Sequence, residues 1–343
     1  MTDIGYVTLY VNAIAIMLSI GTVAMVWKLK TKDALEKKIF IGLFILTILM
    51  GVFYILCALR DDKVISCSHL GAMLLETGLE LLINLFAFHW FIYVEYRLYH
   101  SADHIRRNVL LFSGPCLVIT IMDLVNIFTE FLLQYDDDLG IVTETPLYVV
   151  TDVIRLGYFT CTLFILELRK RHDDSLKFFS VRPFFIPVMS YVLLYYFTPY
   201  ATVDLGLAIG LALIYVELIN EKCYQDSESG FFNRLYLDYL RRRIAEGKYD
   251  LESALVYEFP GGDVATSAKL ILKQLPKDCD TIRYGKDTVV TLTKVNNRGP
   301  LSMLSEDVQL SLNEAGIPVE VHINLKKKKE SGAEFLERVL AKG

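Results

Sequence analysis

Residues 39–59 read IFIGLFILTILMGVFYILCAL and contain no charged side chain. A transmembrane helix needs about 20 predominantly apolar residues to cross the hydrocarbon core of a bilayer. This stretch therefore has the length and the composition of a membrane span. Further stretches on both sides of it have the same character, and together they predict a bundle of seven transmembrane helices: 4–27, 39–59, 71–94, 109–128, 147–166, 183–198 and 200–219.

The composition of the whole chain agrees with this interpretation. Of its 343 residues, 53% are hydrophobic and only 22% are charged, whereas soluble domains usually contain more charge and fewer apolar residues. These values exclude a simple soluble enzyme, a disordered chain and a collagen-like protein. The apolar stretches lie almost entirely before Asn220. We therefore predict a membrane domain at 1–220 and a soluble domain at 221–343.

The distribution of basic residues predicts how the bundle is oriented. The loops after the first, third and fifth spans hold twelve Lys and Arg residues, whereas the loops on the other side hold only Arg60 and Lys63. Cytoplasmic loops of membrane proteins are enriched in Lys and Arg. We therefore expect the N-terminus outside the cell and the soluble domain in the cytoplasm. The outer loop at 130–144 is purely acidic, which favours a solvated loop over a cation-binding one.

Ionisable side chains inside the predicted spans are candidates for a functional site, because they are costly in a bilayer. Glu76 and Glu80 are one helical turn apart, so they share a helix face with Asn84. The charged candidates all fall in the outer half of the bilayer: Glu76, Glu80, Asp123, Asp152 and Arg155. Two interpretations stay open at this point. The side chains either line a ligand pocket that opens to the outside, or form a polar network that fixes the helix packing.

The residues after 220 alternate between strand and helix patterns. They predict helices at 235–245, 263–274, 301–314 and 331–340, and strands at 253–259, 280–284, 288–293 and 318–325. After the first helix the order is βαββαβ with a terminal helix, which is typical of ferredoxin-like domains. We therefore predict a small α+β domain in which helices cover one face of an antiparallel sheet.

Segments of this domain resemble the GGDEF family, whose members are diguanylate cyclases. The stretch DSESGFFNR at 226–234 is similar to the family motif DxLTGLxNR, and SALVYEF at 253–259 is similar to the family's first strand. The stretch DTIRYGKDTVVTL at 280–292 is similar to the hairpin that carries the family's name. The matching positions are Asp226, Gly230, Asn233, Arg234, Arg283, Gly285 and Asp287. The membrane half also resembles the sensor regions found ahead of bacterial histidine kinases and GGDEF domains.

The chain departs from the family at positions that the resemblance assigns to catalysis. One metal-binding carboxylate, Glu258, is kept at the end of the first strand, but Pro260 stands at the second acidic position. In the hairpin, Lys286 replaces a glycine and Thr288 replaces the metal-binding glutamate. Phosphoryl transfer depends on metal ions that neutralise the triphosphate. We therefore expect no catalytic residues, and only vestigial positions at Glu258, Gly285, Lys286, Asp287 and Thr288.

The sequence as a whole predicts a signal-transduction receptor of the bacterial cell membrane. Its cytoplasmic domain is expected to act through partner or dimer contacts, or by binding a nucleotide without turnover. We expect no cofactor and no metal, apart from Mg²⁺ if a nucleotide is bound. The expected partners are the lipid bilayer, a small-molecule ligand from outside, and a second copy or a cytoplasmic protein, but not nucleic acid.

Two alternatives remain at this stage. The first is an active membrane-bound diguanylate cyclase, which joins two GTP molecules into cyclic di-GMP with Glu258 as a metal ligand. The second is a transporter with a regulatory domain.

Overall fold

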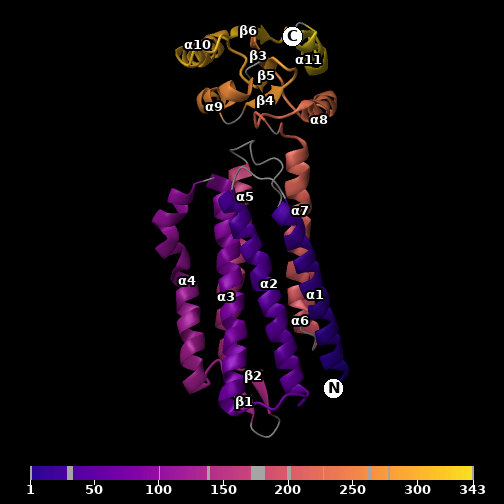
Figure 1. Cartoon of the computed structure of the whole chain (residues 1–343), viewed down its shortest axis with the longest axis vertical. Helices are drawn as coiled ribbons and strands as arrows, with labels where there is room; N and C mark the ends of the chain where they lie inside the picture. Colours follow the sequence, from indigo (N-terminus) through magenta and orange to yellow (C-terminus); the bar gives the residue numbers. More distant parts are fainter. Residues whose placement is uncertain are drawn as a thin grey trace. The chain divides into compact units, whose positions relative to one another are not determined.

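The computed structural model describes residues 2–28, 34–99, 101–136, 140–170, 182–198, 202–226, 228–261, 264–276 and 279–341. The chain divides into two compact units. Along the described residues, the first unit extends to Glu217 and the second begins at Leu218. Figure 1 shows that the first unit consists mainly of long helices, whereas the second contains a small sheet with shorter helices.

Seven helices form most of the first unit. They are α1 (Asp3–Lys28), α2 (Ala34–Asp61), α3 (His69–Tyr99), α4 (Ala102–Thr129), α5 (Val149–Lys170), α6 (Arg182–Phe197) and α7 (Val203–Cys223). Among the described residues, six helices are long and apolar enough to cross a membrane, which indicates a membrane protein. With 16 residues, α6 is shorter than these six. Six of the seven predicted spans therefore match the structure, and the span at 183–198 stays a prediction.

Helix α1 illustrates why these helices suit a lipid environment. Its buried face consists mostly of small and polar residues, spaced alternately three and four positions apart: Gly5, Thr8, Asn12, Ala15, Ser19, Thr22 and Val26. Its exposed side chains are large and apolar, and they include Ile14, Met17, Ile20 and Met25. Small residues let membrane helices approach closely, while lipid contacts favour apolar side chains. This pattern fits a helix that packs on α2 and faces lipid elsewhere (Figure 1).

A short hairpin occupies the predicted acidic loop. Strands β1 (Leu133–Asp136) and β2 (Ile141–Glu144) pair antiparallel, and the 3-10 turn η1 (Pro146–Tyr148) leads into α5. The side chain of Asn126 anchors the start of the hairpin, because its Oδ1 accepts hydrogen bonds from Leu132 N at 2.6 Å and Leu133 N at 3.2 Å. The predicted acidic positions Asp137 and Asp138 lie outside the described residues.

The second unit contains one four-stranded sheet. Its elements are α8 (Arg234–Ala245), β3 (Ser253–Glu258), α9 (Val264–Gln274), β4 (Asp280–Arg283), β5 (Thr288–Thr293), α10 (Arg298–Glu314), β6 (Glu320–Leu325) and α11 (Gly332–Leu340). The strands are all antiparallel to their neighbours, in the order β4-β5-β3-β6. The prediction that 253–259 and 288–293 share a sheet, with a hairpin between β4 and β5, is confirmed.

Helices cover both faces of this sheet, not one face as the sequence predicted. One core cluster joins α8 and α11 to sheet residues such as Val256 and Val290. The other joins α9 and α10 to the alternate residues, such as Leu255 and Val289. The physical reason is that β3 is apolar at successive positions and is buried along almost its whole length, so both of its faces need a cover.

Candidate functional site

Arg155 is the centre of a buried polar network in the first unit. It lies on α5, is 6% exposed and forms an ion pair with Glu80 of α3. The hydroxyl of Tyr148 joins the two charges, because it donates to Glu80 Oε1 at 2.9 Å and accepts from Arg155 Nη1 at 2.9 Å. Since all three side chains are buried, their polar groups depend on one another for hydrogen bonds.

The network continues from Arg155 to α4. Arg155 Nε donates to Asn84 Oδ1 at 2.7 Å, and Asn84 Nδ2 donates to Asp123 Oδ2 at 2.6 Å. Arg155 Nη1 also lies 3.3 Å from Asp152 Oδ1, one turn earlier on the same helix. The structure therefore brings together four of the five predicted charged residues, and it links α3, α4 and α5 through them.

The fifth predicted residue, Glu76, belongs to a separate ion pair. Its Oε1 lies 2.6 Å from Arg60 Nη2, and the same guanidinium lies 2.7 Å from Asp61. Arg60 was predicted to lie in a loop, but it lies in the last turn of α2 with only 3% exposure. Arg60 can also donate to the carbonyl of Ala72 at 3.4 Å.

Asp204 is a buried acidic residue that was not among the predicted site residues. It lies in the first turn of α7 and is 0% exposed. Within the described part of the chain, neither of its carboxylate oxygens has a hydrogen-bond partner. A methyl group placed on Gly51 of α2 would lie 2.6 Å from Asp204 Oδ2, so α2 and α7 approach closely here. The signal was an acidic residue near the start of the apolar run 200–219.

In the second unit, Arg283 ties the segment before α8 to the sheet. Its Nη1 lies 3.0 Å from Asp226 Oδ2 and 2.7 Å from Glu228 Oε2. Asp226 also accepts hydrogen bonds from the backbone and the hydroxyl of Ser229. Asn233 caps α8 by accepting from Leu235 N at 3.0 Å. Three positions that resemble the GGDEF motifs, Asp226, Asn233 and Arg283, therefore hold this segment in place.

The pKa of Asp226 leads to a pH prediction. Partial burial alone would raise this pKa, but the hydrogen bonds from Ser229 and the contact with Arg283 outweigh it and lower the pKa below its ordinary value. The resulting stabilisation is complete above the unfolded value of about 4 and is lost as the pH falls through the folded value. We expect the free energy of unfolding, measured by thermal unfolding with circular dichroism between pH 2 and 5, to fall by about 0.5–1 kcal/mol as Asp226 is protonated and its pairing with Arg283 is lost. The Asp226→Asn variant should lack this part of the pH dependence, and an unchanged profile would contradict the prediction.

The positions predicted to be vestigial lie around the β4–β5 hairpin and the end of β3. Glu258 is paired in register with Thr288, and Phe259 N donates to Asp287 O at 2.8 Å. The amides of Tyr284 and Gly285 both donate to Thr288 O, at 3.0 and 3.1 Å. The end of β3 and the start of β5 therefore place Glu258 and Thr288 directly opposite each other on neighbouring strands.

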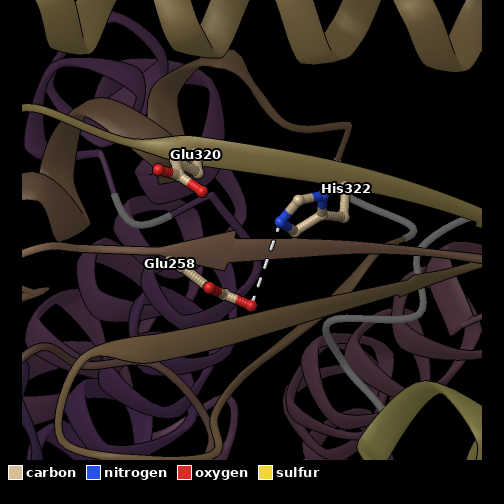
Figure 2. Close-up of side chains that lie close together, drawn as sticks. All are labelled: Glu258, Glu320 and His322. Carbon is tan, nitrogen blue, oxygen red and sulfur yellow. Dashed lines mark ion pairs between the residues drawn. The ribbon is translucent and has the colours of Figure 1, made fainter. Parts of the chain in front are cut away.

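A different group of metal-binding side chains lies on the other side of Glu258. Figure 2 shows Glu258 on β3 close to Glu320 and His322 on β6. Each residue has one potential ligand atom within 4.8 Å of those of the other two. Among the described residues, no other group of three or more His, Cys, Asp or Glu side chains has this spacing. Glu320 and His322 were not among the residues predicted from the sequence.

Comparisons with known proteins found matches among solved structures. No family model and no curated protein matches the sequence. Among solved structures, the chain is similar to the Vibrio cholerae LapD S helix-GGDEF-EAL structure bound to c-di-GMP, with 15% sequence identity and a TM-score of 0.32. The match covers 38% of this chain and 36% of that chain, so the chain spans about a third of the length of the solved structure. A TM-score this low does not establish a shared fold.

Proposed function

We propose that the chain is a membrane receptor whose second unit is a degenerate GGDEF-like domain without cyclase activity. The observation that carries this proposal is the pairing of Glu258 with Thr288, beside a hairpin that resembles the GGDEF motif. The βαββαβ order and the strand order β4-β5-β3-β6 support a ferredoxin-like fold for this unit. The tether between Asp226 and Arg283 supports the same assignment.

The arrangement around Glu258 explains the absence of turnover in this proposal. Two metal ions normally clamp the attacking and leaving oxygens in such phosphoryl transfers. On the hairpin side, Glu258 is accompanied by Thr288, and an alcohol is a weak ligand for Mg²⁺ compared with a carboxylate. Lys286 adds a long side chain to the turn, where the family has a glycine. The unit would therefore act through a protein partner, a second copy or a nucleotide bound without reaction.

The receptor part of the proposal rests on the first unit. Its helices are suited to a bilayer, and the excess of Lys and Arg in alternate loops supports a cytoplasmic second unit. Helix α7 runs without interruption from Val203 to Cys223, beyond the division between the units at Glu217. A continuous helix is stiffer than a flexible linker. In this proposal α7 passes a displacement of the membrane helices to the second unit.

The enzymatic part of the proposal is tested by a cyclase assay. The full chain in detergent is incubated with GTP and Mg²⁺ or Mn²⁺, and cyclic di-GMP is measured by mass spectrometry beside an active GGDEF enzyme. We expect no product, because Thr288 stands opposite Glu258 at the position where the family has a metal-binding glutamate. Product that is formed by the pure protein and disappears in the Glu258→Ala variant would restore the active cyclase.

A further inference from the structure

Three ligating side chains meet where β3 ends and β6 begins. Glu258 and Glu320 are directly opposite each other in the antiparallel register, and His322 lies opposite Val256. Because side chains alternate along a strand, Glu258, Glu320 and His322 project from the same face of the sheet. His322 Nε2 lies 4.0 Å from Glu258 Oε1, and the two groups point toward each other in Figure 2.

This arrangement carries a cost in the absence of a cation. Like charges directly opposite each other on neighbouring strands are destabilising. In the described part of the chain, no hydrogen bond joins the Glu258 or Glu320 carboxylate to another side chain. Glu258 forms an ion pair with His322. Glu258 and His322 keep side-chain exposures of 39% and 55%. A cation that reaches this face from solvent would relieve the repulsion.

We propose that Glu258, Glu320 and His322 bind a divalent transition-metal ion of the zinc class. Imidazole and carboxylate together suit Zn²⁺, whereas Mg²⁺ prefers an octahedral shell of oxygen ligands. Ligands at about 2.0–2.1 Å from a tetrahedral Zn²⁺ lie about 3.3 Å apart. The observed 4.0 Å between His322 and Glu258 requires only small side-chain rotations to reach that value. Three protein ligands leave a fourth position for water or an incoming group.

The proposed zinc site shares Glu258 with the vestigial nucleotide site but takes its other two ligands from a different strand. Its second and third ligands come from β6, on the opposite side of β3 from Thr288 and the hairpin. It needs no residue of the hairpin, so it does not depend on the proposed signalling function. The paired strands fix the ligand backbones, which limits the reorganisation needed for binding.

The test is a metal titration of the full chain in detergent. The four cysteines that are not buried, Cys67, Cys161, Cys223 and Cys279, are first replaced by serine so that thiolates do not compete. Zn²⁺ binding is measured by calorimetry, and Co²⁺ is used as a probe because its visible spectrum reports the coordination geometry. We expect one equivalent to bind, and the His322→Ala variant to bind at least about 10–100-fold more weakly.

Matched variants separate this site from general metal binding. Glu320→Gln should weaken binding in the same way, while its similar shape keeps β6 intact. Glu314→Gln changes an exposed carboxylate on α10, and His69→Ala changes an exposed histidine on α3; both should bind like the parent. Zn²⁺ binding that is insensitive to His322→Ala and Glu320→Gln, no binding at millimolar metal, or equal affinity for Mg²⁺ would each overturn the proposal.

Discussion

Replacing Arg155 by alanine is expected to destabilise the first unit by about 3–5 kcal/mol, because it removes one partner of a buried ion pair. Glu80 would keep only the hydrogen bond from Tyr148, and Asn84 would lose the donor on its Oδ1. Asp152 would lose its nearby cation as well. Thermal unfolding of the full chain in detergent, followed by circular dichroism, measures the effect.

Two comparisons make this prediction specific. Arg106→Ala removes an exposed arginine from α4 and should leave the unfolding temperature nearly unchanged, because exposed charges contribute little. Glu80→Gln should destabilise less than Arg155→Ala, since the amide oxygen can still accept from either Arg155 or Tyr148. If Arg155→Ala unfolds like the parent, yet abolishes stabilisation by a compound found in a metabolite screen, the network serves as a ligand pocket and the structural interpretation is wrong.

The geometry favours the structural interpretation of this network. Every nitrogen of the Arg155 guanidinium contacts a named side chain: Nε meets Asn84, Nη1 meets Tyr148 and Asp152, and Nη2 meets Glu80. For an anionic ligand to bind to Arg155, at least one guanidinium nitrogen would have to give up its present side-chain partner. We therefore propose that the network couples α3, α4 and α5, and that a ligand would act by disturbing this coupling.

The sequence predicted much of this network, because ionisable residues are conspicuous in apolar segments. Glu80, Asp123, Asp152 and Arg155 were identified from their positions along the predicted spans, and the structure joins them through Asn84. Glu76 was placed in the same group because it is one turn from Glu80. Its separate pairing with Arg60 could not be foreseen, since it depends on where α2 ends, and sequence patterns define helix ends poorly.

Contacts between distant segments explain the rest of what the sequence did not show. The strands of the second unit were predictable from local alternation and apolar runs, and β3, β4, β5 and β6 lie close to the predicted ranges. The proximity of Glu258 to Glu320 and His322 depends on the register between β3 and β6, which no local pattern specifies. The second helical layer of α8 and α11 was missed for the same reason, because both helices come from outside the βαββαβ pattern.

A close approach between α6 and α7 leads to the second large expected effect, for Gly210→Ala in α7. A methyl group at Gly210 would lie 2.7 Å from Phe184 Cδ2 and 2.9 Å from the carbonyl oxygen of Phe184 in α6. The ring could turn away, but the backbone oxygen can move only if α6 itself shifts. We expect the substitution to destabilise the unit by about 2 kcal/mol, within the range for overpacked sites.

The shift of α6 caused by Gly210→Ala should also be detectable at Trp90 of α3. The rings of Trp90 and Phe184 stack with centroids 3.8 Å apart, and Trp90 Nε1 donates to Thr162 Oγ1 of α5 at 3.1 Å. A shift of α6 would therefore change the surroundings of this buried indole, and tryptophan fluorescence should change together with the unfolding temperature. Trp27→Phe provides the background for this measurement, because Trp27 is 69% exposed and would otherwise contribute a second signal.

Gly157→Ala in α5 is the matched control for the Gly210 prediction. A methyl group there meets no atom within 4 Å, so alanine adds helix propensity without a clash and should stabilise the unit by up to about 1 kcal/mol. The two substitutions make the same chemical change and should shift the unfolding temperature in opposite directions. At the distance that the structure gives, a methyl group on Gly210 would clash with the Phe184 backbone, and a side-chain rotation could not relieve that clash. If both substitutions raise the unfolding temperature and the fluorescence of Trp90 stays constant, α6 and α7 do not pack at this distance.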